Sequence, residues 1–238
     1  MADRFFSSTP VSGATVELTG DQAHHLANVM RAAPGDEVGL FDVSGREFRT
    51  IIREVSKKRV LLDIEEELPA VEDNLPGVTV AVAMPKGDRQ KFLIEKLVEL
   101  GAAGVIPLAT RRSVAVVKDN VIKRMEKQVV EACKQCGRNR LMTIGKPATL
   151  SQLIESLEGE EGTLRLLAEP RCDETLRARV ADQPVGFRSL IAVGPEGGFT
   201  GEEVEQLKGA GFEPFRIGDS ILRIETAAIA AVTLIRCS

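Results

Sequence analysis

The chain contains no tryptophan and no tyrosine, and it has only 2 histidines and 4 cysteines in 238 residues. So few cysteines exclude a disulfide framework as the basis of the fold. No apolar run is long enough to cross a bilayer, and the N-terminus lacks the basic-then-apolar pattern of a signal peptide. We therefore expect a cytoplasmic protein with no membrane partner. Any stacking on nucleobases would depend on phenylalanine, histidine or arginine.

The net charge of −4 hides an uneven distribution along the chain. Residues 82–146 carry 14 lysines and arginines against 6 aspartates and glutamates, whereas the remainder carries 17 against 29. A basic block within an acidic chain is a plausible electrostatic footprint for RNA binding. A solvated helix face rich in lysine would give the same count, so charge alone leaves both interpretations open.

Two patterns divide the chain into a small and a large domain. Residues 1–70 are rich in strand-like runs, with a hairpin expected at Ser44-Gly45. The stretch 69–77 is polar, contains two prolines and has no period, which is typical of a linker, and we place the linker at residues 71–77. Residues 78–238 alternate between apolar strands and helices, which predicts an α/β domain with a parallel sheet.

One helix is expected in the small domain. Thr19 and Gln22 have the spacing of a capping box at its start. Leu26, Val29 and Met30 would then supply a one-sided apolar face. The sequence therefore predicts a short amphipathic helix that packs on the strands.

The Cys133-x-x-Cys136 motif invites a zinc or redox interpretation. However, Val129, Ala132 and both cysteines recur at helical spacing, which places them on one apolar stripe. The other two cysteines and both histidines lie far away in sequence. We therefore expect a structural role for this pair and no metal site.

Two loops in the last third of the chain point to a ligand. An apolar strand ends at Gly194 in a loop with three glycines, which allow a backbone to approach a ligand closely. Thr200 and Glu203 have capping-box spacing and predict a helix start. The second segment, Ile221–Ala228, puts an arginine and a glutamate at the mouth of an alanine-rich helix. Since α/β proteins bind ligands at strand ends, we expect a cofactor site there, but no GxGxxG motif supports an ordinary Rossmann site.

These two segments, Val193–Phe199 and Leu222–Ala227, resemble the C-terminal signatures of the bacterial small-subunit rRNA uridine-N3 methyltransferases, a family of the SPOUT superfamily. Three further stretches agree with this family: Arg4–Phe6, His24–Asp36 and Glu131–Arg138. The matches run from residue 4 to residue 228, nearly the whole chain. Each motif is weak by itself, but the set is highly specific.

The resemblance implies a small N-terminal PUA-like β-barrel and a C-terminal SPOUT domain whose parallel sheet contains a trefoil knot. It also implies a homodimer that acts on small-subunit rRNA or a ribosomal subunit. S-adenosyl-L-methionine is the implied cofactor, held in an apolar slot by backbone-rich segments at strand ends. The residues implied to bind it are Leu167, Ala168, Glu169, Gly194, Pro195, Glu196, Gly197, Gly198, Ile217, Gly218, Ile221, Leu222, Arg223 and Thr226.

Methyl transfer from a sulfonium to a nitrogen is a direct displacement, so the protein must align the reactants, exclude water and make the acceptor nucleophilic. The imide of uridine is a poor nucleophile because N3 carries a proton and shares its lone pair with two carbonyls. A base near the ring and a cation near its oxygens would overcome this. By resemblance, Arg223 stabilises the developing charge or positions the uridine. Glu225 could be the base, but it could equally hold Arg223 or cap its own helix.

Guanidinium and ammonium groups bind phosphates through charge and directed hydrogen bonds. The candidates for RNA contacts are Arg4, Arg31, Lys86, Arg89, Arg112 and Arg138. Arg138 could instead cap the carbonyls of the preceding helix. His24 and His25 are more typical of a structural or solvated pair.

The chain departs from the family pattern at three places. Ser220 stands where many relatives have arginine, Arg111 stands where an acidic residue is common, and Leu141-Met142 replaces a usual Val-Pro. These differences affect the expected RNA contacts and leave the cofactor loops intact.

Two other functions are compatible with the sequence. One is a SPOUT methyltransferase that acts on a different RNA atom, such as a ribose 2′-hydroxyl in tRNA. The other is a non-catalytic RNA-binding protein of ribosome assembly that keeps the knot. The intact loops and the Arg223-x-Glu225 pattern argue against the non-catalytic protein, and the uridine-N3 enzyme is our leading hypothesis.

Overall fold

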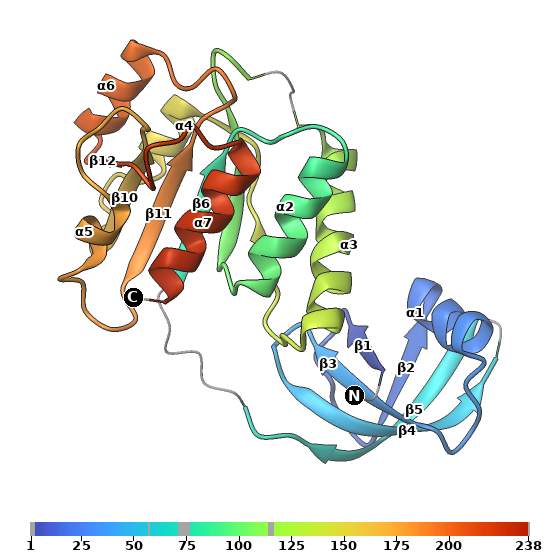
Figure 1. Ribbon diagram of the computed structural model, residues 1–238. Coiled ribbons are helices and arrows are strands. Elements are labelled where there is room, and N and C mark those ends of the chain that lie inside the picture. The colour runs from blue at the N-terminus through green and yellow to red at the C-terminus, as the bar shows by residue number, and fades with distance from the viewer. Residues whose placement is uncertain (1–2, 57, 71–76, 114–116, 238) are drawn as a thin grey trace. The chain divides into compact units, whose positions relative to one another are not determined.

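The computed structural model describes residues 3–56, 58–70, 77–113 and 117–237. The chain divides into two compact units. The small unit comprises Met1–Glu72 with Val130–Leu141, and the large unit comprises Asp73–Val129 with Met142–Ser238 (Figure 1). The predicted linker, residues 71–77, lies outside the described residues except for Gly77, which begins the first strand of the large unit.

The small unit contains a five-stranded mixed sheet in the order β1-β3-β4-β5-β2. Strands β1 and β3 are parallel, and the other neighbours are antiparallel. Alternate side chains of the strands enter one core with the helical segment, where Phe5, Leu26, Leu40, Ile52 and Leu62 are almost fully buried. The elements are β1 (Arg4–Ser7), β2 (Thr15–Thr19), α1 (Gly20–His24), the π-helix η1 (His25–Met30), β3 (Glu37–Asp42), β4 (Glu47–Val55) and β5 (Arg59–Glu67). This confirms the predicted β-rich domain with one helical segment.

The β3–β4 hairpin turns at Ser44-Gly45, as the sequence predicts. Gly45 has a φ of 86°, a left-handed conformation that glycine adopts without steric cost. The buried carboxylate of Asp42 accepts hydrogen bonds from the backbone N–H groups of Val11 and Ser44, each at 2.9 Å. It also pairs with the guanidinium of Arg46 at 2.9 Å. Burial would raise the pKa of Asp42, but the hydrogen bonds outweigh burial and hold that pKa below its usual value.

The helical segment differs from its prediction in two ways. Thr19 is the N-cap of α1, but its side chain makes no capping hydrogen bond. The side chain of Gln22 instead accepts a hydrogen bond from the backbone N–H of Phe6 at 3.4 Å, so the predicted capping box is wrong. Val29 is 62% exposed, because residues His25–Met30 form a π-helix whose wider turn changes which side chains share a face.

The large unit is built on a sheet in the order β12-β10-β11-β6-β7-β8, with β9 also paired to β7. Every pairing in it is parallel, which confirms the predicted α/β class. The strands are β6 (Gly77–Val82), β7 (Gly104–Ala109), β8 (Thr143–Ile144), β9 (Ala148–Thr149), β10 (Thr163–Ala168), β11 (Arg188–Val193) and β12 (Glu213–Phe215). The trefoil knot stays a prediction.

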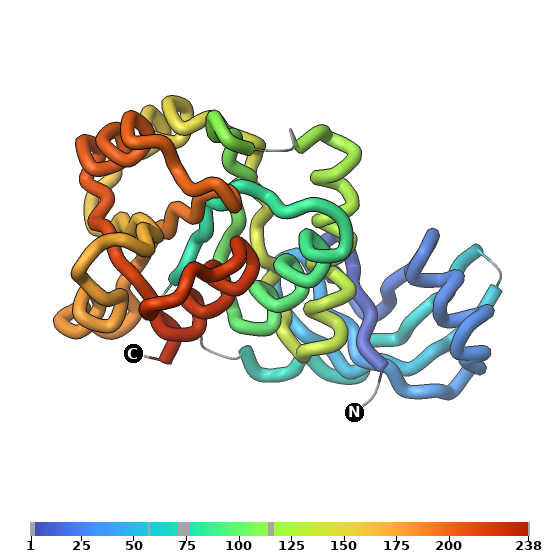
Figure 2. The backbone as a smooth tube through the Cα atoms, turned by 45° about the horizontal axis from the view of Figure 1, so that its top comes forward, coloured from blue at the N-terminus to red at the C-terminus, as the bar shows by residue number. Residues whose placement is uncertain are grey.

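Helices cover the sheet. On one face α7 lies against α2 and over β6 and β11 (Figures 1 and 2). On the other face α4 and α6 pack on a cluster that includes Leu108, Leu153, Leu167, Leu190 and Leu207. The helices are α2 (Asp88–Glu99), α3 (Asp119–Cys136), α4 (Leu150–Glu155), α5 (Leu176–Val180), α6 (Gly201–Gly209) and α7 (Ile224–Arg236). In the described ranges, no helix is both long enough and apolar enough to span a membrane.

The CxxC pair lies at the end of α3. Cys133 is fully buried, as the apolar stripe predicts, but Cys136 is exposed. The prediction of a buried Cys136 is wrong: this residue is the last of α3, directly before Gly137, whose φ of 83° ends the helix, and it is exposed. Among the described residues, no three or more His, Cys, Asp or Glu side chains gather in a way that could hold a metal ion.

Candidate active site

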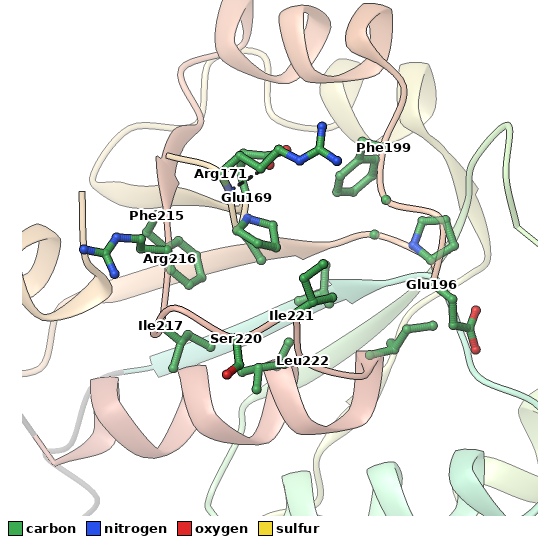
Figure 3. Close-up of a pocket in the computed structure, with 18 of the residues that line it drawn as sticks. Glu169, Arg171, Glu196, Phe199, Phe215, Arg216, Ile217, Ser220, Ile221 and Leu222 are labelled. Atoms are coloured by element: carbon green, nitrogen blue, oxygen red, sulfur yellow. Dashed lines mark hydrogen bonds between the residues drawn. The ribbon is translucent and has the colours of Figure 1, made fainter. Parts of the chain in front are cut away.

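A cavity of about 420 Å³ opens in the large unit beyond the carboxyl ends of β10, β11 and β12 (Figure 3). Its walls are the loop after β10, the glycine loop after β11, and the segment between β12 and α7. This is the edge at which parallel sheets bind ligands, since several loops converge there. The volume lies in the range of small-molecule and cofactor sites.

Most of the residues predicted to bind the cofactor line this cavity. They are Ala168, Glu169, Gly194, Pro195, Glu196, Gly197, Gly198, Ile217, Gly218, Ile221 and Leu222. Three predicted residues do not line it. Leu167 is completely buried, with its side chain in the core between the sheet and α6. Arg223 is exposed at the N-cap of α7, and Thr226 is exposed in its first turn. Both adjoin residues that line the cavity.

Other lining residues escaped the sequence prediction. They are Pro170, Arg171, Val193, Phe199, Phe215, Arg216, Asp219, Ser220, Ile224 and Ala227, together with Arg112, which we had expected to contact RNA. Figure 3 shows the side chain of Arg171 extending toward Phe199. The only sequence feature that could have indicated these lining residues is their position, because most of them adjoin predicted residues in the same segments.

The glycine loop is shaped by close contacts. A Cβ atom at Gly194 would lie 3.0 Å from Cδ2 of Phe199 and 3.2 Å from its backbone nitrogen. Gly198 has a φ of 68°, and its N–H donates to the carbonyl of Pro195 at 2.8 Å, which closes a turn. Two of the three glycines are therefore required by packing or by backbone conformation, and the loop presents backbone to the cavity.

The predicted capping box at the start of α6 is confirmed. The Thr200 side chain accepts from the backbone N–H of Glu203, and the Glu203 carboxylate accepts from the backbone N–H of Thr200 at 2.7 Å. Glu203 is buried and also accepts from the backbone N–H of Arg111 at 2.8 Å. The next residue, Arg112, donates to the carbonyl of Gly197 at 2.6 Å. Two adjacent residues of the loop after β7 are therefore bonded to α6 and to the glycine loop.

Charged side chains gather where α2 and α7 begin. Nη1 of Arg89 lies 3.1 Å from Oε1 of Glu196 and 3.9 Å from Oε2 of Glu225. The Glu225 side chain is only 8% exposed, and its Oε2 atom has no hydrogen-bond partner. Arg223 is exposed, and within the described ranges its guanidinium makes no hydrogen bond and no ion pair.

The candidate RNA contacts differ in whether their side chains already form hydrogen bonds or ion pairs within the protein. The buried guanidinium of Arg4 pairs with Glu47 at 3.0 Å, donates to the carbonyl of Cys133 at 2.9 Å and bonds to Asn139. Arg4 thus has a structural role in the small unit, and we do not retain it as a phosphate contact. Arg89 is paired with carboxylates, as described above.

Of the remaining candidates, Arg112 is bonded to Gly197, and Arg138 is half-buried and has interactions of its own. Arg31 and Lys86 are exposed, and in the described part of the chain their side chains have no bonding partner. These two are free to contact phosphates. His24 is exposed and bonds to Asn28 at 3.1 Å, which fits the structural interpretation of the histidine pair.

Comparison with known families gives two matches. An RNA methyltransferase domain matches residues 72–236, and an RNA methyltransferase PUA domain matches residues 18–65. Among curated relatives, the "Ribosomal RNA small subunit methyltransferase E" of Synechocystis is 34% identical over 93% of this chain and 73% of its own length. The protein of the same name from Bacillus subtilis is 32% identical over 93% of this chain and 89% of its own length.

Solved structures give the same result. Ribosomal RNA small subunit methyltransferase E from Neisseria gonorrhoeae, bound to S-adenosyl methionine, has a TM-score of 0.87 and 29% identity, and covers 100% of this chain and 98% of its own. A methyltransferase from Legionella pneumophila in complex with the bound cofactor SAM has a TM-score of 0.90 and 28% identity, with the same coverage. The likeness therefore extends over both units.

Proposed function

Since the chain belongs to the RNA methyltransferase family, with a PUA domain before its methyltransferase domain, we propose that it uses S-adenosylmethionine to methylate N3 of a uridine in small-subunit rRNA. The single observation that carries this proposal is the cavity at the strand ends. It joins the glycine loop and the segment before α7 in one site, and it places the start of α7 at the rim.

The residues present fit this cofactor. The cavity is lined by backbone-rich loops and by apolar side chains such as Ile217 and Leu222, and the packing of Gly194 on Phe199 leaves no room for a side chain there. Such a slot suits an adenosine, whose ring can lie against backbone amides. We expect the Gly194–Gly198 loop and the 217–222 segment to hold it. When bound, the cofactor supplies a methyl group on a positively charged sulfur.

The acceptor side needs a base and a cation. Glu225 supplies a carboxylate that is nearly buried, and its Oε2 has no hydrogen-bond partner, so it is available to accept the N3 proton of a bound uridine. We assign Arg223, the N-cap residue of α7, whose guanidinium has no partner among the described residues, to stabilising the charge that develops on the uridine oxygens. Both groups come from the start of α7.

RNA would be bound through exposed cations and the small unit. Lys86 and Arg31 are exposed, and among the described residues they have no side-chain partner, so they can contact phosphates without breaking an existing ion pair. Lys86 follows β6, directly before α2, and Arg31 follows the π-helix of the small unit. We propose these two as backbone contacts that orient the substrate.

Mass spectrometry of digested rRNA tests this proposal. Cells that lack the protein should lose N3-methyluridine from the small-subunit rRNA, and the intact gene should restore it, whereas an Arg223→Ala variant should not. Unchanged N3-methyluridine in the deletion strain would overturn the proposal. Loss of a ribose-methylated nucleotide instead would show that the acceptor is a different RNA atom.

A further inference from the structure

Arg89 lies between two carboxylates from different segments, the cavity-lining Glu196 and the buried Glu225. Its Nη1 atom is 3.1 Å from Oε1 of Glu196, in the loop after β11, and 3.9 Å from Oε2 of Glu225, in the first turn of α7. Arg89 itself belongs to the first turn of α2. One guanidinium therefore connects three elements that are far apart in sequence.

The Glu225 carboxylate needs this neighbour. Its side chain is 8% exposed, and no hydrogen-bond donor fixes the position of its Oε2 atom. Among the described residues, Arg89 is the only cation within 4.0 Å of it. The N-terminus of α7 also favours negative charge, but a buried carboxylate gains most from a nearby cation.

We propose that Arg89 is a positioning residue for methyl transfer, which holds the Glu225 carboxylate in the orientation that the reaction needs. This inference rests on the proposed function, in which Glu225 accepts the N3 proton. The 3.9 Å separation suits this role. A tight hydrogen bond from Arg89 would occupy Oε2, whereas a cation at this distance stabilises the charge and leaves the oxygen available.

Glu196 contacts the same nitrogen of the guanidinium. Its shorter contact with Nη1, at 3.1 Å against 3.9 Å for Glu225, ties Arg89 to the glycine loop. The Arg89 and Glu196 side chains are 41% and 46% exposed, so this pair adds little to stability. The pair instead sets the orientation of the Arg89 guanidinium.

Single-turnover methylation of small ribosomal subunits at saturating S-adenosylmethionine tests this inference. We expect Arg89→Ala to lower the rate constant at least about tenfold, since a base supplies at least that much. The dissociation constants for the donor and for the subunit should stay within about threefold of wild type, because neither is the target of the change. Arg89→Lys and added guanidinium ions should each restore part of the rate.

A double-mutant cycle identifies the partner. If Arg89 acts through Glu225, the Arg89→Ala/Glu225→Gln double variant should be no more than about twofold slower than Glu225→Gln alone. Lys91→Ala is the matched control, because Lys91 lies on the same helix, is 59% exposed and pairs only with Glu95 among described residues. That variant should match wild type.

Three results would overturn the inference: an unchanged rate in Arg89→Ala, a loss confined to donor or RNA affinity, or full additivity with Glu225→Gln. Failure of the proposed function is separate from these, since it would appear as an inactive wild-type protein or as methylation at another atom.

Discussion

At the scale of single residues, the cavity depends on positions where no side chain fits. Gly194 packs so closely on Phe199 that even a methyl group would meet both the ring and the backbone, at 3.0 and 3.2 Å. The ring itself lines the cavity. A displaced Phe199 would therefore change the shape of the wall that the donor contacts.

We predict that Gly194→Ala weakens donor binding about tenfold, because an overpacked contact costs about 1–3 kcal/mol and the ring must move to relieve it. Isothermal titration calorimetry with S-adenosylmethionine measures this. Gly209→Ala is the matched control, since a Cβ at this last residue of α6 meets nothing within 4 Å. Equal donor affinities in the two variants would contradict the packing argument.

A second residue-scale prediction concerns Asp42. Burial raises its pKa, but hydrogen bonds from Ser44 and from the backbone of Val11 and Arg46 outweigh burial and lower the pKa in the folded state. A group of this kind stabilises the fold above its unfolded pKa and loses that effect as the pH falls through the folded value. Urea denaturation of the wild type should therefore show falling stability below about pH 4.

The Asp42→Asn variant should be about 2 kcal/mol or more less stable at neutral pH, because the charged acceptor of buried N–H groups is lost. Its stability should also fall less steeply in acid than that of the wild type. A variant with the same acid dependence as the wild type would show that Asp42 does not titrate as its environment indicates.

At the scale of elements, α6 and the loop after β7 share one carboxylate. Glu203 accepts from the backbone N–H groups of Thr200 and Arg111, while Thr200 contributes the other half of the capping box. Thr200→Ala should cost about 1 kcal/mol as a lost cap. Glu203→Ala should cost more, since two partly buried N–H groups lose their acceptor at about 1–3 kcal/mol each.

The two variants should also differ in donor affinity. Glu203→Ala releases the loop that carries Arg112 to the cavity wall, so its donor affinity should fall, whereas Thr200→Ala leaves that loop bonded. Thermal unfolding with and without S-adenosylmethionine compares both variants in one experiment. Identical melting shifts would refute a shared role for Glu203.

Elements set by local chemistry could be predicted from the sequence. The hairpin at Ser44-Gly45, the capping box of Thr200 and Glu203, and the parallel strands all follow from short patterns, and the structure has them. The exposure of Val29 could not be predicted, because a π-helix has no clear pattern of its own. Gln22 has capping-box spacing but bonds to Phe6, which is distant in sequence.

The same limit applies to the site. Eleven of the residues that the family resemblance implied lie on the cavity, because the motifs that carry the resemblance are the loops at these strand ends. The charged residues could not be assigned in this way. Arg4 and Arg89 are both candidate RNA contacts in the sequence, yet Arg4 is bonded within the small unit and Arg89 pairs with Glu196 and Glu225. Such pairings depend on segments that only the tertiary fold brings together.

At the scale of the whole molecule, charge determines how an acidic protein binds RNA. The net charge is −4, so binding must rely on local cations. Lys86→Ala should weaken binding to the small subunit and reduce the slope of log affinity against log salt by about 1, with donor affinity unchanged. Lys208→Ala is the control, since Lys208 lies on α6 and is paired with Glu205 at 3.0 Å. The same salt slope in Lys86→Ala and wild type would exclude Lys86 as a phosphate contact.

The homodimer stays a prediction that light scattering can test.

The most direct test of the central claim is the identity of the methylated atom. Small subunits from cells that lack this protein would be incubated with the purified protein and S-adenosylmethionine, and the digested rRNA would be examined by mass spectrometry. The account predicts that N3-methyluridine appears with the wild type and is absent or strongly reduced with Arg223→Ala. Methylation of a ribose 2′-hydroxyl, or no methyl transfer by a wild-type protein that binds the donor, would contradict it.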